Sequence, residues 1–137
     1  MFDKILVAVD TSGYSKDALT TARDVARLSG GQIRIVHVRE MSPGKSGPVP
    51  KEELDEAQAV VDDAAKTLSD EGVEATTTIR TSHSGRVAAE IVLEASDWGA
   101  QLIIMATRGL TDLAGLVLGS TTHKVLHLSP IPVLVVR

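Results

Sequence analysis

The stretch Met105-Ala-Thr-Arg-Gly-Leu-Thr-Asp-Leu-Ala-Gly-Leu-Val-Leu-Gly-Ser-Thr-Thr122 follows the apolar run 101–105 and leads into a segment with helical spacing. The apolar run is typical of a buried strand, and the spacing predicts a helix over residues 120–128. Gly109, Gly115 and Gly119 lie between them. Glycine permits left-handed backbone angles and lets a ligand approach the main chain closely.

The start of that helix has two interpretations. The first turn of a helix carries unpaired N–H groups and the positive end of the helix dipole, and hydroxyl side chains stand here at Ser120, Thr121 and Thr122. These groups suit a phosphate. A loop whose serine simply caps a helix has the same pattern, and the spacing alone does not separate the two.

The remaining segments alternate between strand and helix patterns. Strands are predicted over residues 5–9, 33–38, 73–80 and 131–136, and helices over 15–28, 51–68 and between the turn at 81–85 and residues 97–100. This alternation predicts one α/β domain over residues 1–137, a three-layer α/β/α fold with a five-stranded parallel sheet in the order 3-2-1-4-5.

Several local predictions accompany this fold. Residues 73–80 alternate between apolar and polar, as expected for an edge strand, and the Pro- and Gly-rich residues 39–50 are expected to form a loop. The acidic run over residues 52–56 is interpreted as a solvated helix face. Leu54 and Leu128 are expected to point inward, and Ser84 to cap the third helix.

Composition narrows the function. The chain has 137 residues, no cysteine, a net charge of −4 and only 2% aromatic residues. The acidic balance and the shortage of rings argue against nucleic-acid partners, and thiol chemistry is excluded. No apolar run reaches the roughly 20 residues of a membrane helix. The first strand begins almost at once, which leaves no room for a signal peptide, so a cytoplasmic location is expected.

Asp10 follows the first strand, at the point where ligands bind in doubly wound sheets. Its carboxylate can hold a divalent cation that bridges to phosphate oxygens, accept a hydrogen bond from a ribose, or cap the first helix. Arg108 is equally well interpreted as a phosphate clamp or as a solvated side chain. No lysine follows the loop as in a P-loop, and Ser12 and Ser120 have no evident base partner, which argues against a vigorous hydrolase.

Histidines offer three further candidates. His37 is expected to be a packed residue with one hydrogen bond, although a ligand or a pH switch is the alternative. His123 and His127 stand four residues apart, which is metal-ligand spacing on a helix, but no third ligand accompanies them and no metal site is expected there.

The closing stretch from Ile131 to Val136 is apolar without alternation. In the expected strand order it lies at an edge, where an apolar strand is an aggregation hazard unless it is covered. We therefore predict a homodimer in which this strand pairs with its symmetry mate; cover by a loop is the alternative.

These features together resemble the universal stress protein family. The family loop is Gly, two residues, Gly, nine residues, Gly and then Ser or Thr; Gly109, Gly119 and Ser120 match it, and Ala106 replaces its first glycine. Residues 4–12, His37-Val38 and the closing strand resemble the family's other signatures. The resemblance implies a Rossmann-like fold, a dimer through the closing strand, and a pocket for ATP or another adenine nucleotide, sometimes with Mg²⁺ or Mn²⁺.

Transferred position by position, the resemblance implies three groups of nucleotide contacts. Val38 would read the adenine edge through its backbone. The others lie at the end of the first strand, at the phosphate entry and at the phosphate-binding helix start: Ala8, Val9 and Asp10; Met105, Ala106, Arg108 and Gly109; Gly119, Ser120, Thr121 and Thr122. Asp10 is the candidate metal ligand. The implied function is a stress-response nucleotide-binding module with at most slow ATP turnover. Ala106 motivates the alternative, a member that binds no nucleotide and acts through protein contacts.

Overall fold

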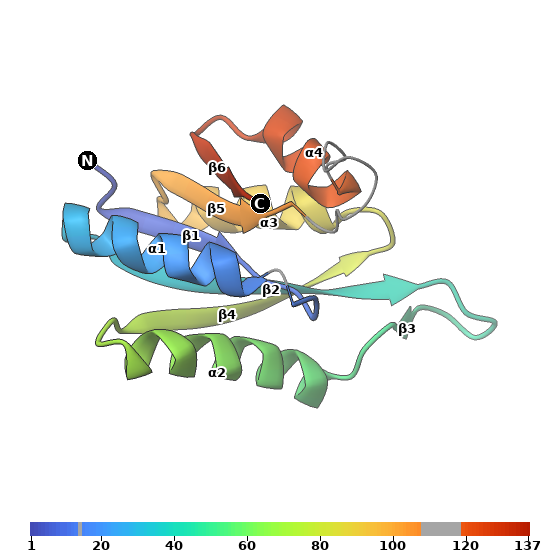
Figure 1. The fold of residues 1–137 in the computed structure, drawn as a ribbon. Helices are drawn as coiled ribbons and strands as arrows, with labels where there is room; N and C mark the ends of the chain where they lie inside the picture. Colours follow the sequence, from blue (N-terminus) through green and yellow to red (C-terminus); the bar gives the residue numbers. More distant parts are fainter. Residues whose placement is uncertain (14, 108–118) are drawn as a thin grey trace.

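A computed structural model describes residues 1–13, 15–107 and 119–137 of the chain (Figure 1). Arg108 and Gly109 therefore lie outside the described residues. Strands and helices alternate along the chain, with these bounds: β1 Lys4–Ala8, α1 Ser15–Ser29, β2 Gln32–Ser42, β3 Val49–Pro50, α2 Leu54–Asp70, β4 Ala75–His83, α3 Val87–Trp98, β5 Leu102–Ala106, α4 Ser120–Leu128 and β6 Val133–Val136.

The five long strands form the predicted parallel sheet. β2 pairs with β4 and β1, β1 pairs with β5, and β5 pairs with β6. In the order of the predicted strands this is 3-2-1-4-5, so the topology is confirmed. β4 is the predicted edge strand, and β6 is the strand at the opposite end of the described sheet.

Helices cover both faces of the sheet, because side chains of the central strands alternate between two apolar clusters. On β1, Ile5 and Val7 face the side covered by α1 and α2, whereas Leu6 faces the side covered by α3 and α4. All three are fully buried. The continuous apolar run of the first strand therefore follows from burial on both faces.

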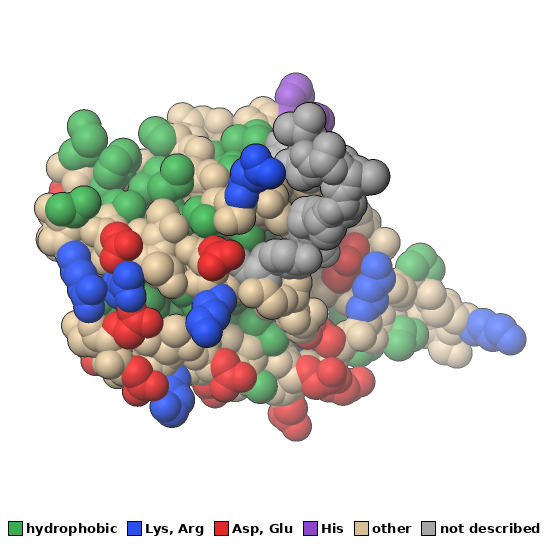
Figure 2. Space-filling view, in the orientation of Figure 1, with side chains coloured by type: hydrophobic (Ala, Val, Ile, Leu, Met, Phe, Trp, Pro, Cys, Tyr) green, Lys and Arg blue, Asp and Glu red, His purple; other side chains and the backbone are tan. Residues whose placement is uncertain are grey.

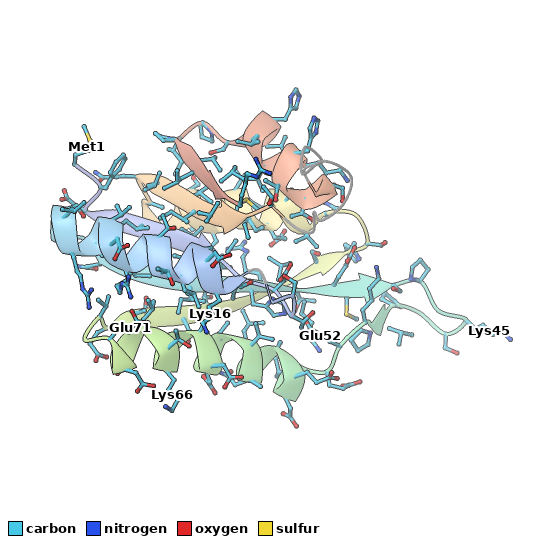
Figure 3. The ribbon with its side chains drawn as sticks, viewed as in Figure 1. Met1, Lys16, Lys45, Glu52, Lys66 and Glu71 are labelled. Atoms are coloured by element: carbon cyan, nitrogen blue, oxygen red, sulfur yellow. The ribbon has the colours of Figure 1, made fainter. Side chains whose placement is uncertain are left out.

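The prediction of a loop over residues 39–50 was wrong in part. β2 continues to Ser42, and Met41 and Ser42 pair with the short antiparallel strand β3. Figure 1 shows this hairpin as an arm that projects beyond the body of the molecule, and Figure 3 places Lys45 at its tip. The long β2 is possible because β4 pairs with it as far as Met41, which supplies backbone partners beyond the end of β1.

Three local predictions about the helices were also wrong. Leu54 and Leu128 are 54% and 50% exposed. Each lies at the end of its helix, beyond the part of the helix that packs on the sheet. The N-cap of α3 is Arg86 and not Ser84. None of the helices in the described part of the chain is long and apolar enough to cross a membrane.

A buried carboxylate joins α3 to the sheet. Glu94 is only 5% exposed, and its two oxygens accept hydrogen bonds from Arg34 of β2 and Arg80 of β4 at 2.8 and 2.9 Å. Hydrogen bonds to Glu90 and then to Glu94 raise the pKa of the Arg80 guanidinium. The Arg34 guanidinium also stacks over the Trp98 ring, 4.8 Å from its centroid. The lone tryptophan therefore packs against the sheet at the end of α3.

Candidate functional site

A cavity of about 190 Å³ lies at the carboxyl ends of the central strands. Most of the predicted nucleotide contacts line it: Ala8, Val9, Asp10, Val38, Met105, Ala106, Gly119, Thr121 and Thr122. These residues come from the ends of β1, β2 and β5 and from the start of α4, which the topology brings together from opposite ends of the sequence. Ligands of doubly wound sheets bind in such a position.

Asp10 organises the turn between β1 and α1. Its Oδ1 accepts hydrogen bonds from the Ser12 N–H at 2.8 Å, the Ser12 hydroxyl at 2.6 Å and the Ser15 hydroxyl at 3.3 Å. The contact with the Ser12 N–H is that of an Asx turn, and the contact with the Ser15 hydroxyl joins the carboxylate to the first residue of α1. They also hold the carboxylate at the wall of the cavity.

The end of β2 supplies a second carboxylate. The Glu40 Oε2 accepts a hydrogen bond from the Gly85 N–H at 2.7 Å, and its Oε1 lies 3.3 Å from the Lys51 ammonium. The Gly85 N–H is the main group that holds the pKa of the Glu40 carboxyl below its ordinary value, and Lys51 adds to the effect, although burial opposes it. Glu40 is therefore an ionised carboxylate in the cavity wall at neutral pH.

His37 makes two hydrogen bonds and not the single one expected. It is 5% exposed; its Nδ1 lies 2.9 Å from the Val9 carbonyl and its Nε2 lies 2.5 Å from Glu52 Oε1. The carbonyl can only accept, so Nδ1 donates to it, and Nε2 contacts the Glu52 carboxylate. Figure 3 shows Glu52 at the entry to α2. The predicted solvated face therefore does not include Glu52, because its carboxylate joins this entry to the ends of β1 and β2.

The start of α4 closes the cavity on the β5 side. Gly119 is the N-cap residue, with extended backbone angles, and no described side chain caps the helix. The Thr122 side chain is buried, and its hydroxyl donates to the Ala106 carbonyl at 2.9 Å. That hydroxyl thus anchors α4 to the end of β5. Ser120 is exposed and does not line the cavity, although it is the first residue of the helix.

Other lining residues were not predicted: Ser12, Ser15, Val36, His37, Glu40, Val87 and Ile91. The sequence contains an indication for Ser12 and Ser15, because hydroxyl residues cluster directly after Asp10. Glu40 had none, since it fell in the segment interpreted as a loop. Val87 and Ile91 belong to α3, for which no role in a site was predicted.

The histidines of α4 lie apart from this site. His123 and His127 are exposed on the helix surface. Within residues 1–13, 15–107 and 119–137, no three His, Cys, Asp or Glu side chains are arranged so that they could hold a metal ion. A cation at the cavity would therefore need most of its ligands from a bound molecule.

The comparisons with known proteins agree on one protein family. The model of the universal stress protein family matches residues 1–137. The universal stress protein YxiE of Bacillus subtilis is 34% identical over an alignment of 151 residues that covers all of both chains. A universal stress protein structure from Archaeoglobus fulgidus has a TM-score of 0.80 at 24% identity and full coverage of both chains, which shows the shared fold. A structure of the universal stress protein from the same organism in complex with dAMP has a TM-score of 0.78 at 25% identity and covers 99% of this chain and 98% of that one.

Proposed function

This chain belongs to the universal stress protein family. We propose that its cavity at the ends of β1, β2 and β5 binds an adenine nucleotide, with ATP as the main candidate. The single observation that carries the proposal is the convergence of three features on one cavity: Val38 of β2, the Asp10 turn and the start of α4. A related structure holds dAMP, which supports an adenine ligand for this fold.

The base would lie against the end of β2. The last paired residues of β1 and β2 are Ala8 and Val36, and β2 runs on past them. The Val36 carbonyl accepts a hydrogen bond from the Val9 N–H at 3.0 Å, so it points toward β1. Backbone groups two residues apart on a strand point to the same edge. The N–H and C=O of Val38 thus face the cavity, as a donor and acceptor pair that matches the edge of adenine.

The phosphates would lie at the start of α4. The N–H groups of its first turn have no partner within the helix, and the dipole places partial positive charge there. α2 provides a contrast, since its first turn holds Asp55 and Glu56 and a capping box formed with Glu53. The first turn of α4 has no acidic residue, so it is suited to an external anion.

A divalent cation fits the site only with help from the ligand. The Asp10 carboxylate can contribute to a Mg²⁺ or Mn²⁺ ion, and phosphate oxygens would supply further ligands. Such an ion would neutralise phosphate charge beside Asp10 and Glu40. We expect ATP binding to weaken when EDTA removes the cation, and binding measured with and without EDTA checks this.

We further propose that the protein acts as a binding module in the cytoplasm, with at most slow ATP turnover. The Ser12 hydroxyl donates to the Asp10 carboxylate at 2.6 Å, and this contact holds the turn after β1. Titration of labelled ATP with Mg²⁺ tests the proposal: we expect saturable binding below millimolar concentrations. Its absence would favour the alternative, in which the chain binds no nucleotide and acts through protein contacts, as Ala106 in the cavity wall suggests.

A homodimer through β6 is the proposed assembly. Among the described residues, β6 pairs with β5 on one side only, and Leu134 in its middle is 38% exposed. Leu126 and Leu128 of the neighbouring α4 are also exposed. Figure 2 shows hydrophobic side chains gathered over the region where Figure 1 places β6 and the N-terminus. Pairing of two β6 edges would satisfy the open backbone groups and bury this surface.

The dimer is tested by placing a charge on β6. We expect Leu134→Arg to convert the dimer into a monomer at micromolar concentration, because the guanidinium would be desolvated at the interface. Sedimentation velocity measures the change. Leu54→Arg is the matched control, since Leu54 is similarly exposed but lies on α2, so this variant should remain dimeric. A dimeric Leu134→Arg protein would place the interface elsewhere.

A further inference from the structure

We propose that Glu40 selects the base of the bound nucleotide, by accepting a hydrogen bond from the exocyclic amine of adenine and repelling bases that carry an oxygen at that position. The inference rests on the proposed function and adds to it a residue that distinguishes adenine from other purines. It follows from the position of Glu40 on β2, from its charge and from the rigidity of its surroundings.

The position follows from strand alternation. Val36, Val38 and Glu40 are each two residues apart on β2, so their side chains share one face, and all three line the cavity. The Val38 backbone faces the cavity from the edge of β2. A base held by that backbone has its next neighbour along β2 at Glu40, about 7 Å further on, which a glutamate side chain can span.

The charge of Glu40 makes it an acceptor only. Its carboxylate is ionised, because the Gly85 N–H donates to Oε2 and the Lys51 ammonium lies beside Oε1. An ionised carboxylate has about four lone-pair positions, so each oxygen keeps capacity for another donor. It offers no proton to a ligand and therefore cannot satisfy an oxygen acceptor.

The surroundings hold this carboxylate in place. Gly85 has a φ of +80°, a conformation that favours glycine, and its N–H points at Glu40 from the turn before α3. The Lys51 N–H donates to the Glu40 carbonyl at 2.9 Å, so the same residue is also fixed through its backbone. Glu40 is thus held from the β3 side and from the α3 side. A mismatched base would have to break these hydrogen bonds in order to displace the carboxylate.

These features match one purine. The exocyclic amine of adenine has two N–H groups, of which the Val38 carbonyl can accept one and Glu40 the other. Hypoxanthine and guanine carry an oxygen there instead. That oxygen would meet two acceptors, and a buried acceptor without a donor is costly.

The test compares ATP with ITP, which carries hypoxanthine, by calorimetric titration of the full chain with Mg²⁺. In the unmodified protein we expect ATP to bind roughly 10- to 100-fold more tightly than ITP. In Glu40→Gln the side chain can turn its amide toward the oxygen and still accept from Gly85. We expect the preference to fall by about tenfold, mainly through tighter binding of ITP. Glu40→Ala should also lose preference, and circular dichroism verifies that each variant is folded.

Asp10→Asn is the matched control, because it removes the other carboxylate charge from the same cavity. It should change the affinities for ATP and ITP by the same factor and keep their ratio. An unchanged ratio in folded Glu40→Gln and Glu40→Ala would overturn the inference, as would equal loss of ratio in Asp10→Asn. Failure of the proposed function gives a different result, in which the unmodified protein binds neither nucleotide.

Discussion

Gly119→Val is expected to abolish nucleotide binding while the protein stays folded. Gly119 is the N-cap of α4 and lines the cavity, and its φ of −61° and ψ of 152° are accessible to valine. The branched side chain would therefore fit the backbone but occupy the space that a phosphate needs next to the first-turn N–H groups. Two lost hydrogen bonds to a charged group correspond to a loss of affinity of about 100-fold or more.

Calorimetric titration with ATP and Mg²⁺ measures this loss, and thermal unfolding followed by circular dichroism verifies the fold. Gly119→Ala is the graded control: one methyl group should weaken binding by about tenfold. An unchanged affinity in Gly119→Val would mean that the phosphates lie elsewhere. A lower affinity accompanied by an unfolded protein would show that Gly119 is needed for the fold and not for the ligand.

Glu94→Ala is expected to give the largest loss of stability. The substitution removes the carboxylate that Arg34 and Arg80 share and leaves both guanidinium groups without their most buried partner. Breaking a buried ion pair costs about 3–5 kcal/mol in free energy of unfolding. Both arginine side chains keep partial access to water, so we expect the free energy of unfolding to fall by about 3 kcal/mol.

Urea unfolding measures the change as a shift of the midpoint at constant slope. Glu90→Ala provides the matched control, because Glu90 binds the same Arg80 from a more exposed position on α3. This substitution should lower the free energy of unfolding by about 1 kcal/mol or less. Equal effects of the two substitutions would show that burial of Glu94 is not what makes its ion pairs important.

Most of the fold followed from local patterns, because burial leaves a direct trace in the sequence. The run at residues 5–9 predicted a strand covered on both faces, and the sheet confirms it. The long β2 could not be predicted, since three of its four residues beyond Val38 are polar and all four depend on pairing with β4 and β3 for their strand conformation. The exposed Leu54 and Leu128 show the limit of periodicity at helix ends, where the spacing continues but the sheet does not lie underneath.

The candidate site was predicted unevenly for a related reason. Asp10 follows β1, Ala106 ends β5 and Gly119 precedes α4, so position in the fold alone brings them to one cavity. Val38 reaches the same cavity from the part of β2 that runs past the end of β1. Glu40 and the contact of His37 with Glu52 arise from side chains that meet across segments distant from the motifs. Such contacts depend on the residue at which β2 ends and on the residue at which α2 begins. No pattern in the sequence predicts either position.

The crystal structure of the protein soaked with ATP and Mg²⁺ tests the central claim most directly. We predict the adenine against the Val38 backbone with its amine toward Glu40, and the phosphates at the N–H groups that begin α4. A high-resolution map in which the cavity holds only solvent, from crystals soaked at millimolar ATP, would contradict the account.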